Sequence, residues 1–186
     1  MAVGEIYTPR PLPMGHMVAL KKTSEMIQIS FHVDESAANT FTQATVDVQL
    51  NPLDNEVMLI YAVDFDSFLP DAIAGVNTAV TTSCSTTSRT TIGRLDSSNV
   101  LGSNMTAIRA AGFVDGGVAF TTENPSAPVG AGLDYVGILA TSDLHIQIEG
   151  QNNAIAKVVN GRIYCQRAKA TSSVYAALVQ SEALSS

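Results

Sequence analysis

The chain has 186 residues, of which only 15% are charged, and its formal net charge is −7 at pH 7. This length fits one domain with a real core, whereas a typical soluble domain carries about 25% charged residues. The acidic balance excludes a generic DNA-binding domain, because phosphate repels a body of this charge. A surface poor in charge is typical of a protein surrounded by neighbouring subunits, and equally of a β-domain rich in Ser and Thr.

Residues 1–24 are predicted to form an extended arm. Pro9, Pro11 and Pro13 alternate in this segment, forbid a helix and favour polyproline or edge-strand geometry. Its one acidic and three basic residues leave a charge of +2, so any contact of the arm with nucleic acid is expected to be weak. No apolar core of a signal peptide is present, and we expect a chain made and assembled inside a cell.

The arm contains more apolar side chains than a solvated linker needs. We expect four of them to be buried between subunits, namely Ile6, Tyr7, Leu12 and Met17. Burying such a side chain contributes roughly 1.5–3 kcal/mol. Within its own subunit the arm would be an edge strand, and across subunits it would be a strap. Deleting residues 1–20 is expected to leave the remaining domain folded and to abolish assembly.

Two strands are predicted after the arm. Met26–Val33 alternates apolar and polar residues, which is typical of a half-exposed strand. Thr40–Leu50 repeats the pattern, and residues 51–55 have the composition of a turn. The next segment, Glu56–Asp71, is also strand-like, so we expect it to form a hairpin with Thr40–Leu50.

Glu56–Asp71 contains the longest apolar run of the chain, Val57–Val63. Apolar residues fall on both alternation faces of this run, which predicts a strand covered on both sides. The run is too short to cross a bilayer as a helix, which takes about 20 apolar residues. We therefore predict a core strand and no transmembrane segment.

Three aspartates follow the apolar run, at Asp64, Asp66 and Asp71. Carboxylates at this spacing can bind calcium together with backbone carbonyls, and an ion at a subunit contact is the functional interpretation. The other interpretation is that they mark where a buried strand reaches solvent. No D-x-D-x-D-G loop with a closing Glu is present, and calcium is the only cofactor that the sequence suggests.

The middle of the chain is rich in Ser and Thr. Ala79–Ile92 predicts one or two strands at a sheet edge, or a long strand facing a partner. Asn104 could cap a short helix, Met105–Ala110. Gly112–Thr121 predicts a strand with a glycine bulge.

The last third predicts three strands in quick succession, Leu133–Ala140, Leu144–Glu149 and Ile155–Lys169. The middle strand alternates strictly. Its residues are predicted to face inward at Leu144, Ile146 and Ile148 and outward at His145, Gln147 and Glu149.

Ser172–Leu184 is predicted to be a short helix that ends the chain. A helix of about 12 residues is marginal alone in water, so it must dock on the rest of the domain. We expect it to dock through Val174, Tyr175, Leu178 and Val179.

The cysteines and histidines show no pattern of a metal or catalytic site. Cys84 and Cys165 lack C-x-x-C spacing, and two buried free thiols are favoured over a disulfide. His16, His32 and His145 lie in three different predicted elements, without metal-ligand spacing. No G-x-S-x-G elbow is present, and we predict that the chain is not an enzyme.

About eight strands, two short helices and no βαβ alternation predict an all-β fold. Its form is an antiparallel β-sandwich, and eight strands indicate a jelly roll. We expect an N-terminal arm at 1–24, the sandwich at 25–170 and a C-terminal helix and tail at 171–186.

The arm YTPRPLPMGHM, the strands with Thr-rich outer faces and the three late strands together resemble single jelly-roll coat proteins of icosahedral viruses. This resemblance implies two four-stranded sheets, self-association through edges and loops, and arms that reach into adjacent subunits. It implies a capsid, coat or decoration subunit located in the virion and assembled in the host cytoplasm. Its partners would be copies of itself and other virion proteins, and no catalytic residues come with it.

Two other functions stay open at this stage. One is a β-sandwich binding module, such as an adhesin or a lectin-like domain. The other is a subunit of a non-viral filament, which shares the interfaces but forms open helical polymers.

Overall fold

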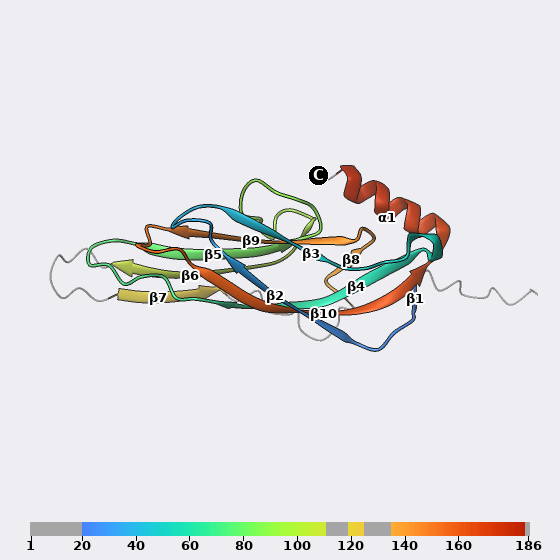
Figure 1. The fold of residues 1–186 in the computed structure, drawn as a ribbon, viewed down its shortest axis with the longest axis horizontal. Coiled ribbons are helices and arrows are strands. Elements are labelled where there is room, and N and C mark those ends of the chain that lie inside the picture. The colour runs from blue at the N-terminus through green and yellow to red at the C-terminus, as the bar shows by residue number, and fades with distance from the viewer. Residues whose placement is uncertain (1–19, 111–118, 125–134, 185–186) are drawn as a thin grey trace, which may run out of the picture.

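Two antiparallel β-sheets and one C-terminal helix make up the computed structural model, which describes residues 20–110, 119–124 and 135–184 (Figure 1). The sheets lie face to face as the two layers of a sandwich. The prediction of an all-β sandwich is confirmed.

The first sheet is organised around β10 (Val158–Ala170). On one side of β10 lie β1 (Leu20–Lys22) and β2 (Ile27–Asp34), one after the other along the same strand. On its other side lies β4 (Glu56–Ser67), followed by the short β8 (Gly137–Leu139). All of these pairs are antiparallel.

The second sheet has the order β3-β9-β5-β6-β7. Its strands are β3 (Thr42–Asp47), β9 (Asp143–Gln151), β5 (Thr78–Ser85), β6 (Val100–Ala110) and β7 (Ala119–Asn124). The chain changes sheet at every step from β2 to β5 and again from β7 to β10. This is the connectivity of a jelly roll, with β1 and β2 as one interrupted strand and β7 as an addition.

The sheet order overturns two sequence predictions about pairing. Thr40–Leu50 and Glu56–Asp71 do not form a hairpin, because β3 pairs with β9 and β4 pairs with β10 and β8. The Ser/Thr-rich segment is not at an edge, because β5 lies between β9 and β6. The two errors have different sources: β3 and β4 are neighbours in sequence but lie in opposite sheets, whereas β5 pairs with its sequence neighbour β6 and gains β9 on its other side.

The helix predicted at Met105–Ala110 is also wrong. These residues and Asn104 belong to β6, which pairs with β5 and β7 on its two sides. Pairing on both edges outweighs the local capping signal. The predicted strand Gly112–Thr121 lies mostly outside the described residues, and its glycine bulge lies wholly outside them.

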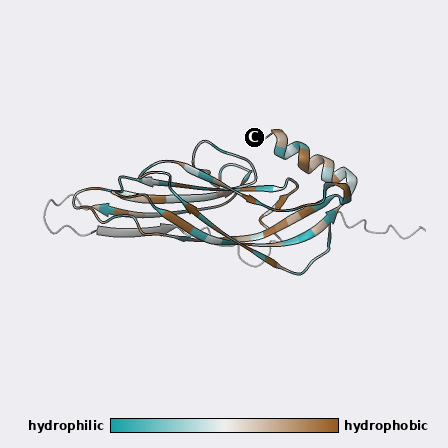
Figure 2. Ribbon diagram, viewed as in Figure 1, coloured by the Kyte–Doolittle hydropathy of each residue, from teal (hydrophilic) through white to brown (hydrophobic). Residues whose placement is uncertain are grey.

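A main apolar core fills the space between the two sheets. It includes the three residues of β9 that were predicted to face inward, and all three are fully buried. Figure 2 shows the hydrophobic segments on the strands of both layers. The largest fully buried side chains of this main core are Met58, Ile60, Leu139, Leu144, Ile146, Ile148 and Ile163.

A second apolar cluster lies on the outer face of the first sheet, under α1 (Ser172–Leu184). The helix and its four docking residues match the sequence prediction, since Val174, Tyr175, Leu178 and Val179 pack against this cluster. Val57 and Leu59 of β4 belong to this cluster and are buried beneath α1. The prediction that the apolar run of β4 is covered on both sides is therefore confirmed.

The outer face of the second sheet carries a buried polar layer. Gln147 points out of the sandwich, as predicted, but it is fully buried. Its amide nitrogen donates to the Ser85 hydroxyl at 2.8 Å and to Gln43, and its amide oxygen accepts from the Ser83 hydroxyl at 2.7 Å. The segment 86–99 covers this layer, because the Gly93 N–H donates to Ser83.

Candidate functional site

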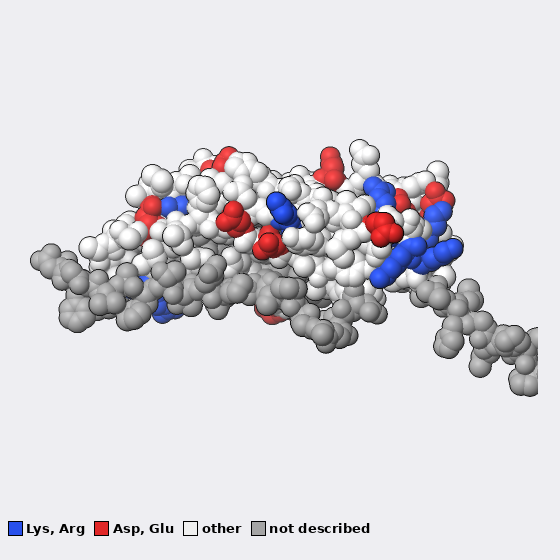
Figure 3. All heavy atoms as spheres, turned by 90° about the horizontal axis from the view of Figure 1, so that it is seen from below, with Lys and Arg blue, Asp and Glu red and all other residues white. Residues whose placement is uncertain are grey.

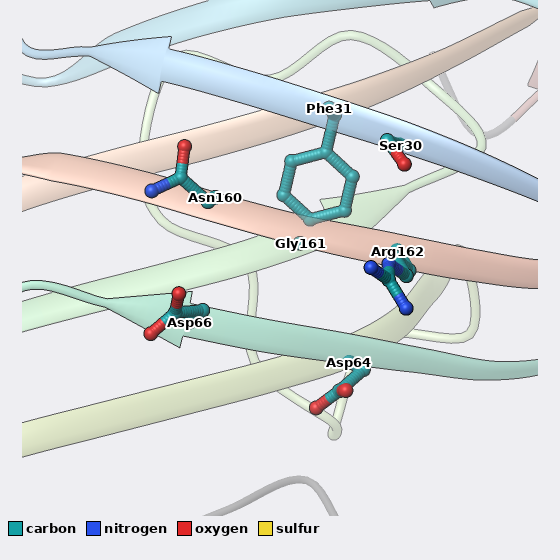
Figure 4. Close-up of a pocket in the computed structure, with 7 residues that line it drawn as sticks. All are labelled: Ser30, Phe31, Asp64, Asp66, Asn160, Gly161 and Arg162. Atoms are coloured by element: carbon teal, nitrogen blue, oxygen red, sulfur yellow. The ribbon is translucent and has the colours of Figure 1, made fainter.

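A shallow depression opens on the outer face of the first sheet, beyond the end covered by α1 (Figure 4). Its volume is about 530 Å³. The backbone register places Asp64 of β4 opposite Arg162 of β10, and Asp66 opposite Asn160. It is lined by Ser30, Phe31, Asp64, Asp66, Asn160, Gly161 and Arg162.

The floor of the depression is closed by Gly161. A Cβ at this position would collide with the backbone carbonyl of Asp64 and with the ring of Phe31. Phe31 is buried in the main core and meets Phe65 edge to face, with ring centroids 6.0 Å apart. The depression is therefore a polar surface above a closely packed sheet.

His32 extends the polar surface along β2. Its Nδ1 lies 2.7 Å from Asn160 Oδ1, and its Nε2 lies 3.2 Å from the carboxylate of Asp34. The hydrogen bond to Asn160, and then the contact with Asp34, raise the pKa of His32 above its ordinary value. His145 lies on β9, where burial lowers its pKa, and His16 lies outside the described residues.

Asp71 has different partners from Asp64 and Asp66. Its carboxylate accepts from Lys157 Nζ at 2.6 Å and from the N–H groups of Ala154 and Ile155. The hydrogen bond from Lys157 holds the pKa of this carboxyl below its ordinary value. Over the described residues, no group of three or more His, Cys, Asp or Glu side chains could hold a metal ion. Calcium binding stays an untested prediction.

Hydrogen bonds join the loop that contains Asp71 to its neighbouring loops at one end of the sandwich. The buried carboxylate of Glu35, in the β2–β3 loop, accepts from the N–H groups of Gly150 and Lys157. Asn153 accepts from the Asp71 N–H at 2.9 Å and donates to the Ala79 carbonyl at 2.8 Å. Sequence reasoning missed Glu35, Asn153 and Lys157, because composition alone does not distinguish a buried polar side chain in a loop from a solvated one.

Three apolar side chains are exposed on these hydrogen-bonded loops. Phe68 is 54% exposed, Leu69 67% and Ile155 63%. The Phe68 N–H donates to the Val158 carbonyl at 3.0 Å, and the Ile155 N–H donates to the Asp71 carboxylate at 3.4 Å, so the backbone of these two residues is held by hydrogen bonds. Apolar side chains held in place at one end of a sandwich are a candidate protein contact.

Basic residues gather at the opposite end, around β1 and the last residues of β10 (Figure 3). Lys21 lies opposite Lys169 in the register. Lys169 is already bonded to Asp54 and Arg167 to Glu56, both at 2.9 Å. These two internal pairs reduce the charge that Lys169 and Arg167 can offer to a polyanion.

The remaining predicted residues are the two cysteines and the four apolar residues of the arm. Cys84 and Cys165 are buried free thiols, as favoured from the sequence, and burial raises the pKa of Cys84 to about 12. The four interface residues proposed on the arm, Ile6, Tyr7, Leu12 and Met17, lie outside the described residues. Among the helices of the described part, none is long and apolar enough to span a bilayer.

Comparisons with known proteins give little. No family model matches the chain, and no curated protein matches it. A solved structure of Desmodium yellow mottle tymovirus aligns with 89% of this chain and 90% of its own chain, at 11% sequence identity and a TM-score of 0.29. A likeness at that TM-score carries no argument, so the fold assignment rests on the strand order.

Proposed function

We propose that this chain is a structural subunit of a virion, a capsid, coat or decoration protein that assembles with copies of itself. The observation that carries the proposal is the jelly-roll connectivity, in which the chain changes sheet at every step from β2 to β5 and from β7 to β10. This connectivity occurs in viral capsid proteins, lectins and cupins. The choice among these classes depends on what the sandwich has inside it and on its surface.

The interior favours a structural role over an enzymatic one. Side chains such as Ile60, Ile146 and Ile163 meet between the sheets with no exposed surface. A ligand-binding barrel of the cupin type needs a cavity with convergent polar groups at this place. In the part of the core that the structure describes, apolar side chains occupy that space instead.

The surface favours assembly over sugar binding. Sugar platforms rely on exposed aromatic rings, and the one ring that lines the polar depression, Phe31, is buried. Outside residues 111–134, the exposed Phe and Tyr rings of the described residues are those of Phe68 and Tyr135, which do not line that depression. A low surface charge and exposed apolar residues on hydrogen-bonded loops suit contact with neighbouring subunits.

On this proposal the partners are other copies of the chain and other virion proteins. The chain would reside in the virion and assemble in the host cytoplasm. The part of the arm before β1, residues 1–19, adds binding energy between subunits, and the small positive charge of residues 1–24 limits any contact with nucleic acid.

The test is assembly of the purified chain, followed by light scattering and negative-stain microscopy. We expect large closed particles, and a variant lacking residues 1–19 is expected to stay folded but not to assemble. The cut at residue 19 keeps β1, which pairs with β10 from Leu20 onward. A full-length chain that stays monomeric at all concentrations would overturn the proposal, and open helical polymers would favour the filament subunit.

A further inference from the structure

β2 leaves one edge of the first sheet open. It pairs with β10 from Ile27 to Asp34, and no strand in the described part of the chain pairs with its other side. The Glu35 N–H donates to the Lys157 carbonyl at 2.9 Å, in line with the register that sets Val33 opposite Val159. In an antiparallel ladder the bonded pairs alternate, so the odd-numbered residues of β2 bond β10. The backbone groups of residues 28, 30, 32 and 34 therefore face the open edge.

This edge lacks three features that commonly block strand addition. Proteins protect edge strands by making them short, by placing Lys or Pro in them, or by a bulge. β1 has two lysines in three residues, and β8 is only three residues long. β2 has eight residues, contains neither Lys nor Pro, and pairs with β10 without a register shift. It is a ready template for one more strand.

The arm contains a segment that suits such an edge. Successive residues of a strand direct their backbone groups to opposite edges, so Pro9, Pro11 and Pro13 share one edge, which has no N–H donors. Arg10 and Leu12 direct complete N–H and C=O pairs to the other edge. Residues that precede a proline favour extended geometry. Residues 8–14 can therefore pair on one side only, as a proline-containing strand at a sheet edge does.

We propose that residues 8–14 of one copy pair with the open edge of β2 in a second copy, as an added outer strand. This inference rests on the proposed function and names the contact that the arm makes. The prolines then face outward and prevent another strand from adding, so each edge takes one arm and no open sheet grows.

The position of β1 argues for a second copy over the arm's own subunit. β1 and β2 run in the same direction along β10, with Leu20 opposite Ala170 and Ile27 opposite Cys165. If the same chain folded back through residues 15–19, Met14 would lie opposite Leu20 and Thr8 opposite Met26. The proline segment would then stop before Gln28–Asp34. An arm from a neighbouring copy has no such limit.

The test uses a fluorescent peptide of residues 6–16 and the chain lacking residues 1–19. Fluorescence polarisation is expected to show saturable binding of the peptide and of its Arg10→Ala variant, which keeps the N–H. Arg10→Pro removes one N–H from the pairing edge and is expected to weaken binding by about tenfold or more. Equal binding of the Ala and Pro peptides would overturn the proposal.

Hydrogen exchange locates the contact without any substitution in the sandwich. Bound peptide is expected to slow exchange at the amides of residues 28, 30 and 32. Slowed exchange on β3 in place of β2 would overturn the proposal. Slow exchange of the β2 amides before peptide is added would also overturn it, because it indicates that two β2 strands already pair with each other. If the full-length chain forms closed particles and the peptide does not bind, the β2 contact fails and the proposed function stands. If the peptide binds and the full-length chain stays monomeric, the proposed function fails and the contact stands.

Discussion

The outer face of β4 has two halves with different environments. Val57 and Leu59 lie under α1 and are buried, whereas Asp64 and Asp66 line an open depression. Both halves belong to one strand and pair with the same neighbour, β10. The difference comes from the helix, which covers one half and leaves the other exposed.

A β-bulge sets which residues share this face. The pairing of β4 with β10 shifts register where Ala62 is opposite Tyr164 and Ile60 is opposite Cys165, so Tyr61 is the extra residue. Beyond the bulge the alternation is reversed, so Asp64 follows Leu59 on the outer face although one number is even and the other odd. The comparison teaches that a single strand can serve both as core and as open surface.

The largest contrast is expected from truncating one residue of each half. Leu59→Ala removes a buried side chain beneath α1 and should destabilise the fold by about 2–5 kcal/mol. Asp64→Ala, on the open half, should change stability by no more than about 0.5 kcal/mol. Urea unfolding of both variants measures the difference. Similar losses would show that the two halves are not distinct.

The second-largest loss of stability is expected from Glu182, which anchors α1 to the rest of the domain. The carboxylate of Glu182 is buried and accepts from the N–H groups of Ala140 and Thr141, both at 3.0 Å. Glu182→Ala leaves these groups without that acceptor and should destabilise the fold by about 1.5–3 kcal/mol. Gln180→Ala, an exposed position on the same helix, is the matched control, and an equal loss in both variants would contradict the anchoring role.

Gly161→Ala tests how closely the sheet is packed beneath the open half. The added methyl group would collide with the Asp64 carbonyl and the Phe31 ring, and such overpacking destabilises by about 1–3 kcal/mol. Asn160→Ala, one residue away and facing outward, is the comparison. If thermal unfolding shows that Gly161→Ala leaves the stability unchanged, the sheet beneath the depression can shift to accept the added methyl group.

The smallest effect concerns the protonation of His32 on the open half. Asn160 and Asp34 raise the pKa of His32 above 6.5, so its contribution to stability is present below that pH and is lost as the pH rises through the raised value. NMR titration should show the raised pKa in the wild type and a lower one in Asn160→Ala. An unchanged titration would remove Asn160 as the cause.

Much of this architecture could be predicted from residue patterns. Strict alternation identified β9, and the apolar face of Ser172–Leu184 identified the docked helix. The pairing of β3 could not be predicted, because its partner β9 lies about a hundred residues away in sequence. Local rules favour pairing between sequence neighbours, which holds for β5 and β6 but fails for β3 and β4, because these lie in opposite sheets.

The candidate surfaces were predicted less well, for a related reason. Asp71 is close to Asp66 in sequence, but the loop carries it to Lys157. Gln147 was expected at the surface, but segment 86–99 buries it. In both cases a loop decides the environment of the side chain, and no short-range pattern encodes where that loop packs.

The central place of β10 has a consequence for biosynthesis. β1, β2 and β4 all pair with β10, and β2 and β4 do not pair with each other. The pairs that join β1, β2 and β4 through β10 therefore cannot form until β10 has been synthesised, long after those three strands. Contacts so distant in sequence slow folding and leave the edges of the early strands unpaired in the meantime. A chain terminated before β10 would lack the strand that joins β1, β2 and β4 into one sheet, and is not expected to assemble.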